Sequence, residues 1–188
     1  LYNIFGSTNL ALKQFKSAIK NFKKALEISP NLPEVFYNLG LSFHGEKNFE
    51  RAIYSYEKAI KLKPDYAEAY CNMGMSFNEK GDLEGAIKSY NKTLEFNPDH
   101  FGAYYNLGEV YGKTGKLNLA IKNYKKAISL NPDNASVYNN LGEVYSKIRK
   151  FNESIINYKK AIELQPTFWE AYNNLSLIYE EKGDIQPG

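Results

Sequence analysis

The stretch AYYNLGEVY, residues 103–111, puts an asparagine two residues before a glycine inside a mostly apolar run. The same pair recurs as YNLG (37–40), CNMG (71–74) and NNLG (139–142), and NNLS (173–176) keeps the asparagine but has serine for glycine. Each copy lies 34 residues after the one before it. Repetition at a fixed period of this length is typical of an array of short structural units, so it outranks other sequence signals.

Small residues and prolines keep the same register with no insertion or deletion. Small side chains let two helix backbones approach closely, and proline ends a helix because it lacks the next hydrogen-bond donor. The small residues are Gly6, Gly40, Gly74, Gly108, Gly142 and Ser176, then Ala18, Ala52, Ala86, Ala120 and Ser154, and the prolines are Pro30, Pro64, Pro98, Pro132 and Pro166. Each unit is therefore expected to be a closely packed pair of helices.

The spacing of apolar residues within a unit predicts these helices directly. From Phe36 to Phe43 it follows i, i+3, i+4 and i+7, and a second run with the same period starts at Phe49. Asp65, with Glu68 three residues later, is expected to cap the start of the next unit's first helix.

Glycine marks the turn between the paired helices at Gly81, Gly115 and Gly183, where a left-handed residue can end the first helix. Arg149 stands at the equivalent position, and a less regular turn is expected there.

Together the Asn–x–Gly element, the small residue after the turn and the closing proline resemble the tetratricopeptide repeat family. The resemblance implies an all-α, right-handed superhelical solenoid of antiparallel helix hairpins. The expected single array spans 1–188: a partial repeat at 1–32, complete repeats at 33–66, 67–100, 101–134 and 135–168, the first helix of a sixth repeat at 169–182, and a tail at 183–188.

Composition favours a folded intracellular protein, cytoplasmic or nuclear. The chain is 43% hydrophobic and 24% charged, and it has a net charge of +3, which argues against disorder. The single cysteine, Cys71, excludes an internal disulfide. No apolar run approaches the roughly 18 residues of a membrane span, so no membrane partner is expected. The chain starts at Leu1, and a longer parent protein is expected.

The recurring asparagines are expected to share one face of the first helices. Asn106 follows Tyr104 by two residues, about 200° around the helix, so it points away from the second helix of its own unit. In the tetratricopeptide family the first helices line the inner wall, and the resemblance therefore places the asparagines along a groove. This asparagine ladder comprises Asn38, Asn72, Asn106, Asn140 and Asn174, and Ile4 interrupts the series in the first repeat.

An amide both donates and accepts hydrogen bonds, so the ladder can satisfy the main chain of a bound peptide. Helices pack about 8–10 Å apart and an extended peptide rises about 3.3–3.6 Å per residue. Each asparagine would then meet roughly every third ligand residue. The ladder predicts a scaffold that binds an extended protein or peptide segment. In the alternative interpretation, the amides bond neighbouring repeats and have only a structural role.

Secondary groove positions adjoin the ladder. One residue before each asparagine come Tyr37, Cys71, Tyr105, Asn139 and Asn173, and three residues after it come Leu41, Met75, Glu109, Glu143 and Leu177. The N-terminal part of the groove is thus expected to be apolar and aromatic, and the later part polar and acidic. A partner with an apolar segment followed by a basic one would suit it.

The sequence offers no catalytic residues, metal site or cofactor motif. His44, His100 and Cys71 have no metal-ligand spacing, and no glycine-rich phosphate loop is present. Lysines also recur every 34 residues on the second helices, at Lys24, Lys58, Lys92, Lys126 and Lys160. Glutamates are interspersed on the same helices and no aromatics alternate with these lysines, so a solvated surface is expected and not a nucleic-acid site.

Two subclasses can be compared by residue. Co-chaperones grip a partner's carboxylates with Lys and Arg, but the matching inner positions here are Glu34, Glu68, Gly102, Ser136 and Glu170. By contrast, YAEAYCNMG (66–74) and GDLEGAI (81–87) resemble the repeat arm of SPINDLY-type and O-GlcNAc transferases. This implies a substrate-recognition arm of an O-linked sugar transferase, for GlcNAc or fucose, whose catalytic domain lies elsewhere.

The last predicted helix, 169–182, has no second helix to cover its apolar side. Trp169, Tyr172, Leu175 and Tyr179 lie on it. Weak self-association through this face is expected.

Overall fold

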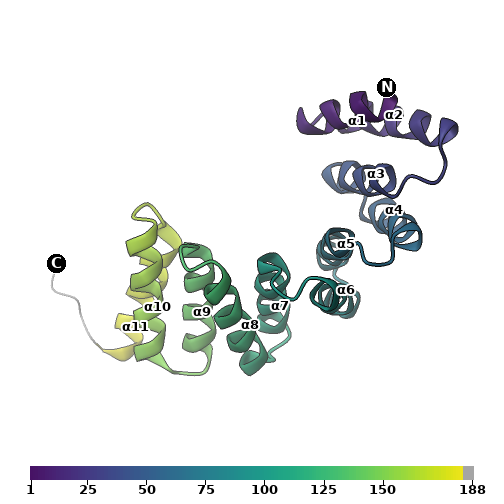
Figure 1. Ribbon diagram of the computed structural model, residues 1–188. Coiled ribbons are helices and arrows are strands. Elements are labelled where there is room, and N and C mark those ends of the chain that lie inside the picture. The colour runs from purple at the N-terminus through teal and green to yellow at the C-terminus, as the bar shows by residue number, and fades with distance from the viewer. Residues whose placement is uncertain (184–188) are drawn as a thin grey trace. The chain divides into compact units, whose positions relative to one another are not determined.

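The computed structural model describes residues 1–183, and all regular structure in that range is helical. The chain divides into two compact units, residues 1–100 and residues 101–188, which are described separately (Figure 1). The helices of the first unit are α1 (Tyr2–Ala11), α2 (Phe15–Ile28), α3 (Pro33–Gly45), α4 (Phe49–Leu62), α5 (Ala67–Lys80) and α6 (Leu83–Phe96). Those of the second are α7 (Phe101–Lys113), α8 (Leu117–Leu130), α9 (Ala135–Lys147), α10 (Phe151–Leu164) and α11 (Trp169–Lys182).

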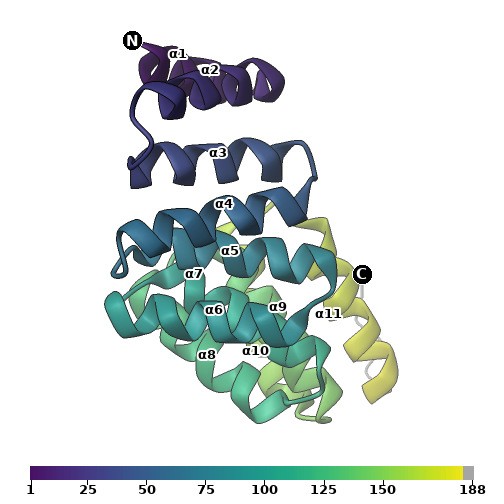
Figure 2. The same ribbon diagram turned by 90° about the vertical axis from the view of Figure 1, so that its right-hand side faces the viewer.

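Consecutive helices form hairpins, and each hairpin packs on the next within its unit (Figure 2). In the first unit α3 also contacts both α1 and α5, and in the second α9 contacts both α7 and α11. No such contact joins α2 with α4 or α8 with α10. The first helices of the hairpins therefore form the more closely packed layer of each unit. The predicted all-α fold of stacked helix hairpins is confirmed.

Each hairpin is closed by an aromatic ring that lies against the recurring glycine. A Cβ atom added at Gly40 would come 2.5 Å from the Tyr56 ring, and one at Gly108 would come equally close to the Tyr124 ring. The rings lie 16 residues after their glycines and are buried; they belong to Phe22, Tyr56, Tyr90, Tyr124 and Tyr158. Close approach of the two helices therefore requires glycine at these positions.

The second series of small residues is buried in the same interface. Ala18, Ala52, Ala86 and Ala120 are fully buried. Ser154, which replaces alanine in the last complete hairpin, donates its hydroxyl to the Gly142 carbonyl at 2.8 Å. The hydroxyl is thus paired across the hairpin, and serine is tolerated without an unsatisfied polar group.

The turns inside the hairpins are more uniform than the sequence predicts. Gly81, Gly115 and Gly183 have positive φ, as expected. Arg149 takes the same left-handed conformation with φ 58°, so the expected irregular turn is not found. Lys13 and Lys47 do likewise in the first two hairpins, because the packed helices on either side fix the turn whatever residue occupies it.

Proline follows each second helix as predicted, two residues beyond its last helical residue. The predicted cap at Asp65 is wrong. Helix α5 begins at Ala67 with Tyr66 as its N-cap residue, and the Asp65 carbonyl, not its side chain, accepts a hydrogen bond from the Ala67 N–H at 2.9 Å.

A matched pair of glycines on α7 tests the role of the close approach. Gly108→Ala should destabilise the chain by about 1–3 kcal/mol, because its Cβ would overlap the Tyr124 ring. Gly112→Ala should instead stabilise it by up to about 1 kcal/mol, because the nearest atom is 3.8 Å away and alanine favours helix. Chemical denaturation of both variants checks the prediction, and equal effects of the two changes would contradict it.

Candidate binding surface

The ladder asparagines lie one on each first helix, α3, α5, α7, α9 and α11, and all five side chains are half-buried. Asn38 and Asn72 belong to the first unit and the other three to the second. Their polar atoms therefore remain partly accessible, but several of them already have partners in the protein.

Asn72 is bonded to its own helix and to the preceding hairpin. Its Nδ2 donates to the Tyr37 hydroxyl oxygen at 3.0 Å and to the Glu68 carbonyl at 2.9 Å. The Glu68 carbonyl can only accept, which fixes the orientation of the amide. Both amide hydrogens are thus in use, and the described residues offer no donor to Oδ1.

The second unit repeats this arrangement. Asn140 Nδ2 donates to the Tyr105 hydroxyl oxygen at 3.1 Å, and Asn174 Nδ2 donates to Asn139 Oδ1 at the same distance. Asn139 is buried and its Nδ2 lies 3.4 Å from Asn140 Oδ1. In all three cases the acceptor belongs to the residue 35 positions earlier. These three ladder asparagines therefore form hydrogen bonds between neighbouring hairpins, as the structural interpretation expects.

Asn38 and Asn106 make no side-chain hydrogen bond to any described residue. For Asn38, the residue 35 positions earlier is Asn3, whose Oδ1 is itself buried without a partner. The amides of Asn38 and Asn106 are therefore unengaged and half-exposed. The ladder contains two kinds of position, bonded and unbonded.

Two adjoining hollows lie beside the ladder in the second unit. The first hollow, of about 370 Å³, is lined by Tyr105, Glu109 and Lys113 of α7, Tyr124 of α8, and Asn140, Glu143 and Lys147 of α9, with Gly112 and Val144. The second hollow, of about 610 Å³, shares Glu143 and Lys147 and reaches Asn174 and Leu177 of α11. Each hollow thus contains one ladder asparagine and one or more secondary groove residues.

The acidic groove residues are paired with lysines. Glu109 and Lys113 are 2.6 Å apart, as are Glu143 and Lys147, each pair one turn apart on its own helix. The later part of the groove is therefore charged with both signs. Both lysines are about half exposed, and pairs of this kind contribute only about 0.3–0.5 kcal/mol.

Tyr105 and Tyr124 line the first hollow. Burial raises the pKa of Tyr124, and Tyr105, Glu109 and Glu143 raise it further, while a hydrogen bond with Asn140 lowers it. The Tyr105 and Tyr124 rings are 6.1 Å apart. Both hydroxyls stay protonated at neutral pH and can donate or accept hydrogen bonds.

In the first unit, the residues beside the ladder are aromatic and apolar. The Tyr37 ring lies 5.0 Å from the Tyr66 ring and 6.0 Å from the Tyr56 ring. Met75 is exposed and Leu41 half-buried. Cys71 is buried, and burial raises its pKa to about 12, so it is a protonated core thiol and not an open groove residue.

Of the residues that line these hollows, sequence reasoning found Tyr105, Glu109, Asn140, Glu143, Asn174 and Leu177, and it missed Tyr124, Lys113 and Lys147 among others. Tyr124 comes from a second helix and recurs at the 34-residue period as a core residue, which hid its polar end. The two lysines follow Glu109 and Glu143 by four residues, a spacing that could have revealed the ion pairs.

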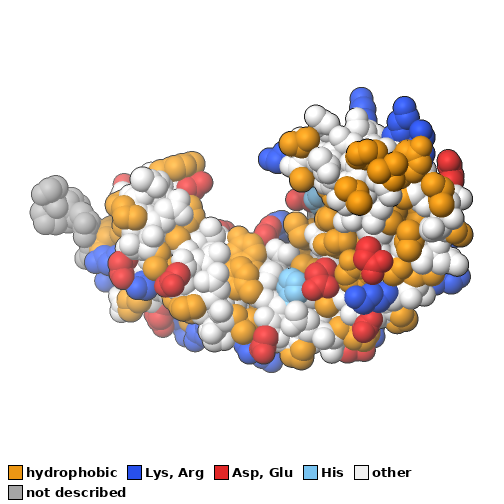
Figure 3. Space-filling model, turned by 45° about the horizontal axis from the view of Figure 1, so that its top comes forward, with side chains coloured by type: hydrophobic (Ala, Val, Ile, Leu, Met, Phe, Trp, Pro, Cys, Tyr) orange, Lys and Arg blue, Asp and Glu red, His pale blue; other side chains and the backbone are white. Residues whose placement is uncertain are grey.

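The expectation that no aromatic residues accompany the recurring lysines is wrong, because aromatic rings lie beside four of them. Lys24 lies over Tyr2, Lys58 over Tyr54, Lys92 over Phe96 and Lys126 over Tyr104, with Nζ 5.1–5.9 Å from the ring centroids. Glutamates pair with Lys92 and Lys160. On the face in Figure 3, acidic and basic side chains are interspersed.

In residues 1–183 no group of three metal-ligating side chains occurs, and no helix is long and apolar enough to cross a membrane. His44 is engaged between first helices, with its Nδ1 2.9 Å from the Ser76 hydroxyl oxygen.

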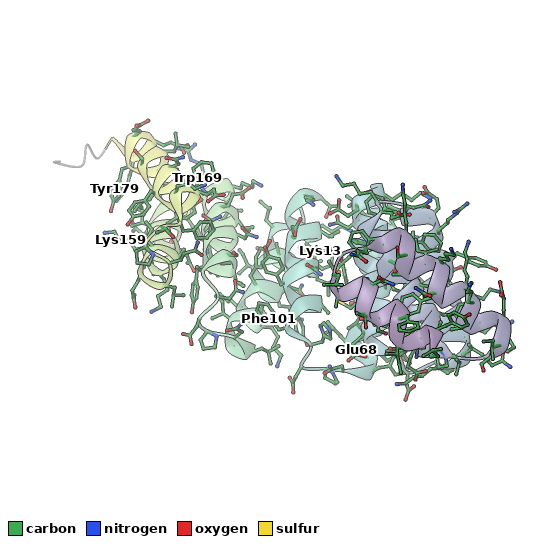
Figure 4. The ribbon with its side chains drawn as sticks, turned by 90° about the horizontal axis from the view of Figure 1, so that it is seen from above. Lys13, Glu68, Phe101, Lys159, Trp169 and Tyr179 are labelled. Carbon is green, nitrogen blue, oxygen red and sulfur yellow. The ribbon has the colours of Figure 1, made fainter. Side chains whose placement is uncertain are left out.

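The apolar side of α11 is partly exposed. Trp169 is 65% exposed and Tyr172 is 48% exposed. Tyr179, further along α11, lies against α10, where Lys159 Nζ is 5.8 Å from its ring centroid (Figure 4).

The hairpin period, the glycine–ring contacts and the layered first helices define an α-helical repeat protein. The chain belongs to the tetratricopeptide repeat family. Models described as TPR repeat match residues 6–47, 45–77, 74–115 and 113–148, and models described as tetratricopeptide repeat match 135–168 and 157–186.

Solved structures of this family resemble the chain closely. One crystal structure of MamA has a TM-score of 0.81 and 30% identity over 86% of this chain and 94% of that one. A second MamA structure has a TM-score of 0.80 and 27% identity, covering 100% and 96%. YrrB, described as a TPR protein with an unusual peptide-binding site, shares the fold at 19% identity and a TM-score of 0.77, covering 92% and 89%. No curated protein sequence matches the chain.

The bond between hairpins can be tested without touching the ladder. Tyr105→Phe removes the acceptor of Asn140 Nδ2 while keeping the ring, and it should destabilise the second unit by about 0.5–1.5 kcal/mol. Tyr111→Phe on the same helix is the control, since the Tyr111 side chain makes no hydrogen bond to any described residue. Denaturation midpoints of the two variants check this. An unchanged midpoint for Tyr105→Phe would show that the hydrogen bond contributes nothing to the free energy of unfolding.

Proposed function

We propose that this chain is a protein-binding scaffold that holds an extended segment of its partner against the first helices through the asparagine ladder. The observation that carries the proposal is the single amide of Asn72, whose hydrogens are bonded within the protein while Oδ1 is unpaired on a half-exposed side chain. The scaffold performs no chemical step itself. Its proposed setting is intracellular, cytoplasmic or nuclear, in keeping with one buried reduced cysteine.

The hydrogen bonds between hairpins define what the ladder offers a ligand. At Asn72, where Nδ2 is bonded to the preceding hairpin, Oδ1 remains to accept a main-chain N–H from the peptide. At Asn140, Oδ1 already accepts from Asn139 Nδ2 at 3.4 Å. At Asn38 and Asn106 both amide groups are unengaged, so these positions can pair with both N–H and C=O of a ligand residue. The structural and ligand-binding interpretations are thus compatible, because they use different atoms of the same side chain.

The ladder alone supports weak binding. Each hydrogen bond contributes about 0.5–1.5 kcal/mol net, and ordering a flexible peptide opposes much of the sum. Affinity therefore depends on side-chain anchors. Tyr37, Leu41 and Met75 offer apolar contacts in the first unit, and the hollows of the second unit offer polar ones.

The experiment compares two double variants on an array of random twelve-residue peptides. Asn38→Ala with Asn106→Ala removes ladder amides that have no structural bond, so it should leave the melting temperature unchanged and weaken array binding several-fold. Tyr37→Phe with Tyr105→Phe removes the bonds between hairpins and should lower stability with a smaller effect on binding. Binding that survives the asparagine changes intact would leave the ladder with a structural role only.

The chain could also be the substrate-recognition arm of an O-linked sugar transferase. This proposal rests on the stretches 66–74 and 81–87 alone, and none of the solved structures named above carries that description. In that setting the same surface would hold the protein substrate of a catalytic domain on the parent chain.

Self-association through α11 is a separate proposal about partners. Exposed Trp169 and Tyr172 would drive it, and the complex should be weak because a single helix face buries little area. Light scattering at rising concentration should show a mass increase that Trp169→Ser with Tyr172→Ser removes. Exposed Leu119→Ser is the control. A strict monomer at high concentration would contradict the proposal.

A further inference from the structure

We propose that the first hollow of the second unit receives an arginine side chain of the bound segment. The inference rests on the proposed peptide-binding function and names the side chain that anchors the ligand. It is carried by the convergence of Glu109, Glu143, Tyr124 and Asn140 on one hollow between α7 and α9.

Acceptors for a cation come from both neighbouring hairpins. Glu109 is on α7 and Glu143 is on α9, and both line the hollow together with Tyr124. The Tyr124 hydroxyl and the Asn140 amide lie beside each other there. A side chain that enters the hollow therefore meets two carboxylates and two further oxygens that can accept hydrogen bonds.

A guanidinium group fits this set better than an ammonium group. Its five N–H donors lie in a fixed plane and can reach acceptors on both sides, whereas lysine presents three donors at one point. Tyr105 also lines the hollow, and a planar guanidinium group stacks on aromatic rings more readily than an ammonium group does. Gly112 lacks a side chain at the wall, and only Val144 lies within 4 Å of where its Cβ would be. This leaves room for a large side chain.

The resident lysines do not exclude an incoming cation. Lys113 and Lys147 are half-exposed partners on the same helices as the glutamates, and such pairs exchange readily with another cation. The first hollow carries two glutamates and two lysines, and the second adds Glu180 and Glu181, of which Glu181 lies 3.8 Å from Arg149 Nη1. An incoming guanidinium group therefore competes with the resident lysines for the two carboxylates of the first hollow.

The first unit lacks this chemistry. The positions that correspond to Glu109 and Glu143 are Leu41 and Met75, which carry no charge. An arginine anchor is therefore specific to the second unit.

The experiment uses peptides that the chain selects from the random twelve-residue array. Replacing their arginine by citrulline, which keeps the shape and removes the charge, should weaken binding about tenfold, and lysine should recover only part of it. Glu109→Gln with Glu143→Gln should cause a similar loss and remove the preference for arginine over citrulline. Glu95→Gln, which breaks a comparable ion pair on α6, is the control and should have no effect.

Changing the two lysines tests whether the hollow takes a basic or an acidic side chain. The double variant Lys113→Gln with Lys147→Gln should bind arginine-containing peptides a few-fold more tightly, because the carboxylates of Glu109 and Glu143 lose their lysine partners. Weaker binding in this variant would mean that the hollow takes an acidic side chain, and it would overturn the inference. Selected peptides that bind equally well with citrulline would also overturn it while leaving the scaffold function intact, whereas an array with no binder would reject both. Melting curves of all variants check that the hairpins remain folded.

Discussion

The structure depends on a ring seated against a helix backbone. In each complete hairpin an aromatic side chain from the second helix occupies the place that a Cβ atom would need on the first, as Tyr124 does at Gly108. This contact sets both the distance and the rotation between the two helices. Because the ladder asparagine lies two residues before the glycine on the same helix, the contact that closes the hairpin also fixes which way the amide points. Core packing and the candidate binding surface are thus consequences of one constraint.

The same side chains connect the hairpins to one another. Asn72 and Asn140 each donate to a tyrosine hydroxyl of the preceding hairpin, and those tyrosines in turn pack against the ring that closes their own hairpin, as Tyr105 does against Tyr124. A bound main chain that accepts or donates at the ladder would therefore act on groups that also hold neighbouring hairpins together. In a repeat array, where stability is a sum over units and their interfaces, binding and stability are expected to be linked through these amides.

Much of the fold could be predicted because it depends on backbone rules that repeat. The positions of glycine and proline report a close approach and a helix end, whatever the surrounding residues are. Side-chain details were less predictable. The turn at Arg149 is regular because packed helices impose it, and the Asp65 cap failed because the helix starts one residue later than the N-cap pattern requires. The lysine–ring contacts and the Glu109–Lys113 pair depend on how flexible side chains settle, which a period in the sequence does not encode.

The candidate site was predictable to the same extent. The face that carries the ladder follows from helical geometry. Which polar atoms of each amide are bonded within the protein depends on the side chain of the residue 35 positions earlier. A hydroxyl at Tyr37 or Tyr105 takes an amide hydrogen, whereas Asn3 leaves Asn38 unbonded. Variation at that position therefore alters what the ladder presents to a ligand without altering the asparagine itself. A repeat array can in this way keep one recurring residue and still differ in recognition from hairpin to hairpin, because the neighbouring hairpin decides which of its polar atoms stay available.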